Sequence, residues 1–326
     1  IRHGKRLFAE KLERETLKMY DIIVVGAGCA GLTAALYARR ADKSVLVLER
    51  DTFGGQITFS PKVENYPGIK QMSGNEFADM LVEQVLEQGA DIELGCAVGI
   101  AAAPSGEKTV ICEDGSEYSA KAVILATGAR HRTLGVEGEE ALTGHGISYC
   151  AVCDGAFYRD TDVAVIGGGN SALQEALQLS DICRKVTIVQ NLDTFTGEAR
   201  LLDALKKRDN VDYITGTVVA GFESEEGELS ALVLRRVSDG ESSLLKVNGA
   251  FVAIGLIPDN GAFADAVPLD ERGYFDTDES CASPCEGIYT AGDCRAKGVR
   301  QLTTAAADGS VAALAACRYI DSLTEA

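Results

Sequence analysis

Two glycine-rich turns, each set in the same strand, turn, helix and strand pattern, limit the folds open to this chain of 326 residues. The first turn reads GAGCAG at 26–31, after the apolar run 22–25, and its pattern closes with a second strand that ends at Glu49. The second turn reads GGGNSA at 167–172, and a similar helix and strand pattern follows it. The two βαβ units predict an α/β fold with two Rossmann-like dinucleotide-binding domains.

Each glycine of the first turn has its own task. Gly26 permits the tight turn, Gly28 lets a pyrophosphate approach the backbone at the positive helix end, and Gly31 lets helix and strand pack closely. Glu49 follows Gly31 by 18 residues, where a ribose hydroxyl needs an acceptor. We therefore predict a bound dinucleotide at this turn.

The second turn predicts the fold without predicting the ligand. Its helix-closing residue is Ala172, which the motif accepts. An NADPH site needs Arg or Lys after the following strand, and an NADH site needs Asp or Glu at the strand end. Residues 186–199 contain no Lys or Arg, hold the acids Asp193 and Glu198, and have Gln190 at the strand end. This turn is poorly equipped for either nucleotide.

A pair of cysteines, Cys150 and Cys153, lies just before the second turn, and Asp154 follows directly. The two-residue spacing lets a disulfide form and reopen, and a neighbouring carboxylate can donate a proton to a leaving thiolate. A metal site would need a second such pair or a pair of histidines, and the chain has only three histidines. We predict a redox dithiol and no metal; unpaired structural thiols are the alternative.

Composition narrows the partners and the compartment. The net charge of −18 argues against nucleic acid and anionic membranes as partners, and the longest apolar runs fall far short of the ~20 residues of a membrane helix. The other eight cysteines lie in apolar or glycine-rich surroundings, without a secretory signal, so we expect a cytoplasmic protein. The fold is expected to begin near Met19, with residues 1–18 as an extension.

Two later segments predict where the chain crosses between domains. Residues 121–129 and 251–260 each run an apolar strand into a glycine. We predict one domain made of 19–132 and 261–326, with an inserted domain, 133–260, that carries the dithiol.

Near the end of the chain, a strand that ends in Gly292 and Asp293 precedes a long alanine-rich helix. A carboxylate at this place can accept ribitol hydroxyls, and the helix N-terminus can face a flavin carbonyl. Capping of the helix is the alternative role of Asp293.

These motifs occur in a specific combination. GAGCAG, GGQITFSPKVENYPG at 54–68, ILATGA, CAVCDG just before GGGNSA, and a terminal AGDCRAKGVRQLTTAAADG resemble the low-molecular-weight thioredoxin reductase family over essentially all of 19–326. The resemblance implies a homodimer whose FAD is bound by Gly26, Gly28, Gly31, Glu49, Gln56, Asn65, Gly128, Asp293 and Gln301. It also implies that Cys153 lies next to the flavin and attacks the partner disulfide, with Cys150 as its mate and Asp154 as acid.

The chain departs from the family's usual pattern after the second strand. Typical members carry His-Arg-Arg and a further Arg there to hold NADPH, whereas this chain has Gln190, Asn191, Leu192 and Thr196. The departure resembles the clostridial branch, which takes electrons from reduced ferredoxin. Because ferredoxin is acidic, we expect a local basic patch, with these candidates: Arg295, Lys297 and Arg300.

We therefore predict a disulfide reductase that passes electrons through FAD and the dithiol to thioredoxin or a thioredoxin-like protein, with ferredoxin as donor. An ordinary NADPH-dependent thioredoxin reductase is the first alternative, and an oxidase of small dithiols is the second. A flavoenzyme that links nicotinamide to ferredoxin would lack the dithiol, and a non-catalytic nucleotide-binding protein would not need it.

Overall fold

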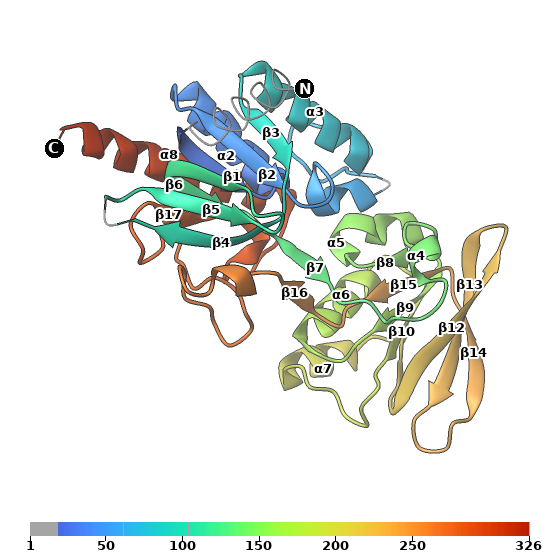
Figure 1. Ribbon diagram of the computed structural model, residues 1–326. Helices are drawn as coiled ribbons and strands as arrows, with labels where there is room; N and C mark the ends of the chain where they lie inside the picture. The colour runs from blue at the N-terminus through green and yellow to red at the C-terminus, as the bar shows by residue number, and fades with distance from the viewer. Residues whose placement is uncertain (1–18, 61, 104, 326) are drawn as a thin grey trace, which may run out of the picture. The chain divides into compact units, whose positions relative to one another are not determined.

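The computed structural model describes residues 19–60, 62–103 and 105–325 (Figure 1). The predicted extension, residues 1–18, lies outside the described residues. Among the described helices, none is both long and apolar enough to cross a membrane.

The chain divides into two compact units, and the second is inserted into the first. The first unit holds the described residues up to Ser60, then Tyr66–Arg130, and the chain from Pro258 on. The second holds His131–Ile257 and the short segment that ends at Asn65. The crossings after Arg130 and Ile257 lie slightly before the predicted ones, after 132 and 260, and Asn65 lies in the second unit although it was predicted in the first domain.

The first unit is built on a seven-stranded sheet with the order β3-β2-β1-β6-β5-β4, in which β17 also pairs with β6. The pairs among β1, β2, β3, β6 and β17 are parallel, and those among β4, β5 and β6 are antiparallel. The strands are β1 (Met19–Val25), β2 (Val45–Glu49), β3 (Asp91–Leu94), β4 (Ala97–Ala102), β5 (Lys108–Cys112), β6 (Glu117–Leu125) and β17 (Ile288–Thr290).

The burial of strand β1 explains why residues 22–25 are all apolar. Ile22 and Val24 belong to the core on the helical face of the sheet, whereas Ile23 and Val25 belong to the core on the opposite face. A strand covered on both faces has no place for alternating polar residues. The helical face is covered by α2 (Cys29–Arg40), α3 (Gly74–Glu87) and α8 (Leu302–Glu325).

The second unit repeats this design around a parallel five-stranded sheet with the order β11-β10-β9-β15-β8. A three-stranded antiparallel sheet, β12-β13-β14, accompanies it. The strands are β8 (Ile147–Ser148), β9 (Asp162–Ile166), β10 (Lys185–Val189), β11 (Val211–Ile214), β12 (Thr217–Glu225), β13 (Glu228–Arg236), β14 (Ser242–Lys246) and β15 (Gly249–Val252).

Strand β9 has the same two-sided burial as β1. Val163 and Val165 pack in a core with helices α6 (Asn170–Ser180) and α7 (Ala199–Leu205), and Ala164 and Ile166 pack in a core with the antiparallel sheet. The predicted fold class, an α/β fold with two Rossmann-like domains, is confirmed.

Short elements complete the chain. Strands β7 and β16, which pair with each other, carry the chain between the units. The remaining elements are β7 (Ala129–His131), β16 (Leu256–Pro258), α4 (Glu139–Leu142), α5 (Ala151–Asp154), η1 (Gly55–Phe59), η2 (Gly155–Tyr158), η3 (Gly261–Phe263) and η4 (Gly292–Cys294).

Candidate functional site

The first glycine turn joins β1 to α2 and has the backbone that the sequence predicts. At Gly26, where φ is +104°, a Cβ would lie 2.4 Å from the Ala126 carbonyl oxygen, and at Gly31 a Cβ would lie 1.9 Å from the Gly26 carbonyl oxygen. No larger residue fits at either position. At Gly28 the nearest neighbour of such a Cβ, the Gly54 carbonyl oxygen, is 3.9 Å away. Space is therefore open where a pyrophosphate would approach the backbone.

Glu49, at the end of β2, turns its carboxylate back to this turn. Its Oε2 accepts a hydrogen bond from the Ala27 N–H at 2.7 Å, and its Oε1 accepts one from the Asp51 N–H at 2.9 Å. The two backbone donors fix the carboxylate beside the glycines. A ribose hydroxyl could donate to the remaining lone pairs, in keeping with the predicted role.

Other predicted residues of the first unit gather at the same end of the sheet. Gly54 forms a bridge to Gly28 and leads into η1, which contains Gln56. The Cys29 thiol donates to the carbonyl of Leu302, the neighbour of Gln301, at 3.5 Å. Asn65 belongs to the segment grouped with the second unit, so the geometry of the first unit does not test its role.

Asp293, in η4, lies on the same side of the fold. A Cβ at the preceding Gly292 would lie 2.7 Å from the Ala30 side chain of α2, and a hydrogen bond from the Gly128 backbone acts on the Cys294 thiol. Asp293 Oδ1 is buried and has no hydrogen bond among the described residues; Lys297 Nζ is 3.8 Å from it. Burial raises the pKa of this carboxyl. Within the described residues, Oδ1 thus has a long ion pair with Lys297 and no hydrogen bond at normal distance.

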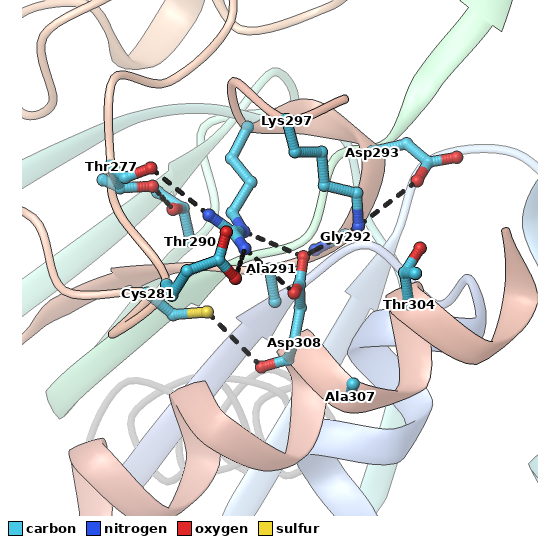
Figure 2. Close-up of polar contacts among 12 residues, drawn as sticks. Thr277, Cys281, Thr290, Ala291, Gly292, Asp293, Lys297, Thr304, Ala307 and Asp308 are labelled. Atoms are coloured by element: carbon cyan, nitrogen blue, oxygen red, sulfur yellow. Dashed lines mark hydrogen bonds and ion pairs between the residues drawn. The ribbon is translucent and has the colours of Figure 1, made fainter. Parts of the chain in front are cut away.

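Asp308, on α8, holds the backbone before Asp293 in place (Figure 2). The Gly292 N–H, Arg295 Nε and Lys297 Nζ donate to its Oδ2 at 3.0, 2.8 and 2.9 Å. Burial acts to raise the pKa of Asp308, but the hydrogen bonds from the two cations outweigh it and the pKa is lowered. A buried ion pair of this kind is weak evidence of added stability, because the cost of desolvating the charges offsets their attraction.

The same cluster corrects one expectation. Arg295 is 1% exposed, the Lys297 side chain is 7% exposed, and the Arg300 guanidinium stacks on the Tyr274 ring at 4.2 Å. The prediction that these three residues form a docking patch for ferredoxin is wrong for Arg295 and Lys297, because both side chains are used inside the protein. Sequence reasoning missed the cluster; the signal was an acid, Asp308, within an alanine-rich helix.

In the second unit, Cys150 and Cys153 are joined by a disulfide, with their Cα atoms 5.3 Å apart. Ser148, at the end of β8, holds the segment on both sides: its Oγ accepts from the Cys150 N–H at 3.1 Å and donates to Asp154 Oδ2 at 2.6 Å. The other oxygen, Asp154 Oδ1, is buried with no hydrogen bond among the described residues.

The environment of Asp154 favours the protonated carboxyl. Burial raises its pKa, and the hydrogen bond from Ser148 opposes that shift. A raised pKa brings the proton transfer of a carboxyl closer to the working pH, as a general acid needs, and Asp154 is the neighbour of Cys153 in the chain. The geometry is compatible with the predicted role as acid.

The second glycine turn also has the predicted backbone, and at Gly169, the counterpart of Gly28, a Cβ would again meet nothing closer than 3.9 Å. At Gly168 a Cβ would lie 2.3 Å from Nε2 of Gln190. The N–H groups of Thr196 and Gly197 both donate to the Gly168 carbonyl at 2.9 Å. The 190–197 segment therefore packs directly on the turn.

Among the described residues, no group of three or more His, Cys, Asp or Glu side chains could hold a metal ion. The other eight cysteines are free thiols, of which Cys96 and Cys285 are half-buried and the rest buried. They therefore have the surroundings of small apolar side chains.

Comparison with known proteins agrees with this geometry. The family model described as pyridine nucleotide-disulphide oxidoreductase matches residues 20–309. A thioredoxin reductase from Listeria innocua is 41% identical over 310 residues, which cover 95% of this chain and 96% of the relative. A protein from Clostridium pasteurianum, named as a 34.2 kDa protein in the rubredoxin operon, is 40% identical over 303 residues, 93% of this chain and 98% of the relative.

A solved structure is similar over the same length. The thioredoxin reductase from Streptococcus pyogenes superposes with a TM-score of 0.89 at 39% identity, covering 93% of this chain and 99% of the solved chain. The shared sequence, the shared fold and the disulfide placed before the second glycine turn lead to one assignment. The chain belongs to the pyridine nucleotide-disulphide oxidoreductases, as a flavoprotein oxidoreductase of the low-molecular-weight thioredoxin reductase family.

Proposed function

We propose that this protein passes electrons through FAD and the Cys150/Cys153 dithiol to thioredoxin or a thioredoxin-like protein, and that reduced ferredoxin supplies them. The disulfide supports the first part, because a reductase of protein disulfides needs such a pair. The names of the relatives from Listeria innocua and Streptococcus pyogenes support thioredoxin as the acceptor. The second glycine turn supports the choice of donor.

The first unit fits FAD, the cofactor that the family implies. The open space at Gly28 and the buried Asp293 Oδ1, which has no hydrogen bond among the described residues, are two features that a dinucleotide would complete. When bound, FAD supplies the redox chemistry between a donor and a disulfide. We propose that it is held by Gly26, Gly28, Gly31, Glu49, Gln56, Asn65, Gly128, Asp293 and Gln301.

The residues of the dithiol then have separate tasks. The disulfide accepts an electron pair and opens into two sulfur atoms, one of which stays a thiolate and attacks the disulfide of the acceptor protein. We propose Cys153 as the cysteine next to the flavin and as the nucleophile, with Cys150 as its mate, following the family resemblance. Asp154 holds the proton that the leaving thiolate takes up.

The observation that carries the choice of donor is the side chain of Gln190. It is 4% exposed, its Nε2 donates to the Thr194 carbonyl at 3.3 Å, and its Oε1 accepts from the Asn191 N–H at 3.1 Å. These bonds hold the side chain against Gly168, the counterpart of Ala27 in the first turn. Gln190 therefore takes the place that Glu49 has in the first unit, without a carboxylate to accept from a ribose hydroxyl and without a cation to bind a 2'-phosphate.

The negative charge at the start of helix α6 also argues against a nucleotide bound at the second turn. Asn170, the first residue of that helix, accepts from the Glu198 N–H at 2.7 Å and donates to Glu198 Oε1 at 3.1 Å. A carboxylate therefore stands at the helix end where a pyrophosphate would bind, and like charges repel. Arg200 pairs with the other oxygen of Glu198, and no Lys or Arg occurs within 186–199 to bind a phosphate.

The relative from Clostridium pasteurianum adds a third support, since it is named for a rubredoxin operon. Rubredoxin, like ferredoxin, is an iron-containing electron carrier. We also propose a homodimer, as the family resemblance implies; light scattering on the purified protein would give its mass in solution.

An anaerobic titration tests the proposal. The flavin absorbance of the purified protein is followed while NADPH, NADH or reduced ferredoxin is added, and oxidised thioredoxin is supplied afterwards. We expect ferredoxin alone to bleach the flavin and thioredoxin to restore it. Rapid bleaching by micromolar NADPH would instead identify an ordinary NADPH-dependent thioredoxin reductase. Slow turnover of thioredoxin with rapid peroxide formation from small dithiols and oxygen would identify an oxidase.

A further inference from the structure

Two side chains of helix α6 form hydrogen bonds with the backbone of Ala151, the residue that follows Cys150 and precedes Cys153 by two. The carboxylate of Glu175 accepts a hydrogen bond from the Ala151 N–H, and Gln178 Nε2 donates to the Ala151 carbonyl at 3.3 Å. Glu175 and Gln178 are three residues apart and share one face of the helix. Close packing supports the contact, because a Cβ at Gly155, which follows α5, would lie 3.1 Å from Leu179 on α6.

Glu175 is an unusual group at this place. It is half-buried, and its Oε2 is buried with no hydrogen bond among the described residues. Burial raises the pKa of the carboxyl to about 7, and the hydrogen bond from the Ala151 N–H opposes the shift. Both protonation states are therefore accessible near neutral pH.

The charged groups on the elements packed against α6 have other partners. Asp154, on α5, bonds to Ser148. Arg200 and Asp203, on α7, pair with Glu198 and Lys206; Asp162, on β9, pairs with Arg184, and Lys185, on β10, pairs with Asp212. None of these pairs includes Glu175, so a new charge at the dithiol would be felt by a carboxylate that no cation neutralises.

We propose that Glu175 is a positioning residue of the dithiol, which holds the Ala151 peptide as a carboxylate while the disulfide is closed and takes up a proton when the disulfide opens. The inference rests on the proposed disulfide reductase function. Glu175 on α6 is then a second carboxyl that serves the dithiol, besides Asp154 on α5.

Opening of the disulfide takes up two electrons and two protons. The electron pair delivered to the protein enters the S–S bond, which breaks. One proton goes to one of the two sulfur atoms, a second proton goes from water to Glu175, and the other sulfur remains a thiolate. A disulfide and a carboxylate thus become a thiol, a thiolate and a carboxylic acid for two electrons and two protons.

The experiment titrates the dithiol without any physiological donor or acceptor. The protein with its flavin is reduced with excess dithiothreitol, the reductant is removed anaerobically, and the rate at which iodoacetamide alkylates Cys150 and Cys153 is measured by mass spectrometry from pH 5 to 10. In the wild type we expect a two-step profile, because the thiol and Glu175 titrate as a coupled pair. Glu175→Gln should leave a single step.

The size of the change follows from the removed charge. A neighbouring carboxylate raises a thiol pKa by about one unit, so Glu175→Gln should alkylate about tenfold faster at the pH where the profiles differ most. The matched control is Glu223→Gln, which removes an exposed carboxylate from β12 of the same unit and should keep the two-step profile. A redox-difference infrared spectrum should show a protonated carboxyl band that appears on reduction, and Glu175→Gln should lose it.

Each outcome bears on one claim. A two-step profile and an unchanged carboxyl band in Glu175→Gln would overturn the role of Glu175. Failure of dithiothreitol to open the disulfide in the wild type would overturn the proposed reductase function instead. If Glu175→Gln does not fold, Glu175→Asp takes its place: it keeps a carboxyl on a shorter side chain, so two steps with shifted midpoints support the role, and wild-type midpoints contradict it.

Discussion

The two glycine turns of this protein have nearly the same backbone and different surroundings. A Cβ at Gly26 would lie 2.4 Å from the Ala126 carbonyl oxygen, and one at Gly167 would lie 2.5 Å from the Ala253 carbonyl oxygen. The space at Gly28 and at its counterpart Gly169 is the same, and the turns differ in the residue at the end of the following strand, which is Glu49 beside the first and the buried Gln190 beside the second. Because the strand and helix need the glycines in order to pack, the motif is evidence for a fold, and evidence for a ligand must come from the residues around it.

A matched pair of substitutions, Gly28→Ala and Gly169→Ala, tests the difference between the two turns most directly. Both glycines precede a helix with negative φ, −76° and −86°, and in both cases a Cβ would meet nothing closer than 3.9 Å. We expect both variants to fold. Gly28→Ala should lose flavin by about tenfold or more, because the methyl group enters the space that a pyrophosphate needs.

Flavin absorbance per protein, with circular dichroism as the check on folding, measures this effect. Gly169→Ala should keep both its flavin and its turnover with ferredoxin. Full flavin in Gly28→Ala, or a loss of ferredoxin-driven turnover in Gly169→Ala, would contradict the distinction between the two turns.

A second substitution asks whether the chemistry of the second unit lies in its dithiol. Asp154→Asn should slow thioredoxin reduction by about 100-fold, because a general acid contributes about that much and an amide has no proton to give. The rate of flavin reduction by the donor should not change. Stopped-flow absorbance separates the two steps; an equal loss in both would show that Asp154 has a structural role instead.

The third prediction concerns a variant whose second turn has the basic residues that an NADPH site needs. Restoring the family's basic residues with Gln190→His, Asn191→Arg, Leu192→Arg and Thr196→Arg should raise the rate of flavin bleaching by NADPH by at least about tenfold, since one charge-assisted hydrogen bond contributes that much. The same variant with Gln190 retained should gain less, because that side chain still covers Gly168. Equal gains would mean that Gln190 is no obstacle.

The smallest effect concerns the stability of the flavin-free protein. Since burial raises the pKa of Asp293, the folded state binds more protons than the unfolded state, and stability falls as the pH rises through this range. Asp293→Asn removes that penalty, so at pH 7 it should melt roughly 2–4 °C higher than the wild type without flavin. The gap should close at acid pH, where both forms are neutral. A lower melting temperature for the variant at pH 7 would contradict the sign.

Part of the candidate site could be predicted from the sequence because its rules are local. The glycine positions follow from steric needs within one turn, and the spacing of Cys150 and Cys153 allows a disulfide within four residues. The charged candidates for a docking patch failed for the opposite reason. Whether Arg295 lies on the surface depends on Asp308, which the fold brings to it from α8.

The sequence by itself determined the fold class, the redox pair and the lack of cations at the second turn, since each depends on residue types at short spacing. Only the tertiary structure decided that Gln190 lies on Gly168 and that the carboxylate of Glu175 accepts a hydrogen bond from the Ala151 N–H. The physical reason is that burial and hydrogen bonding between distant segments depend on how helices and strands pack. A polar side chain has the same letter in the sequence whether it faces water or a buried backbone N–H.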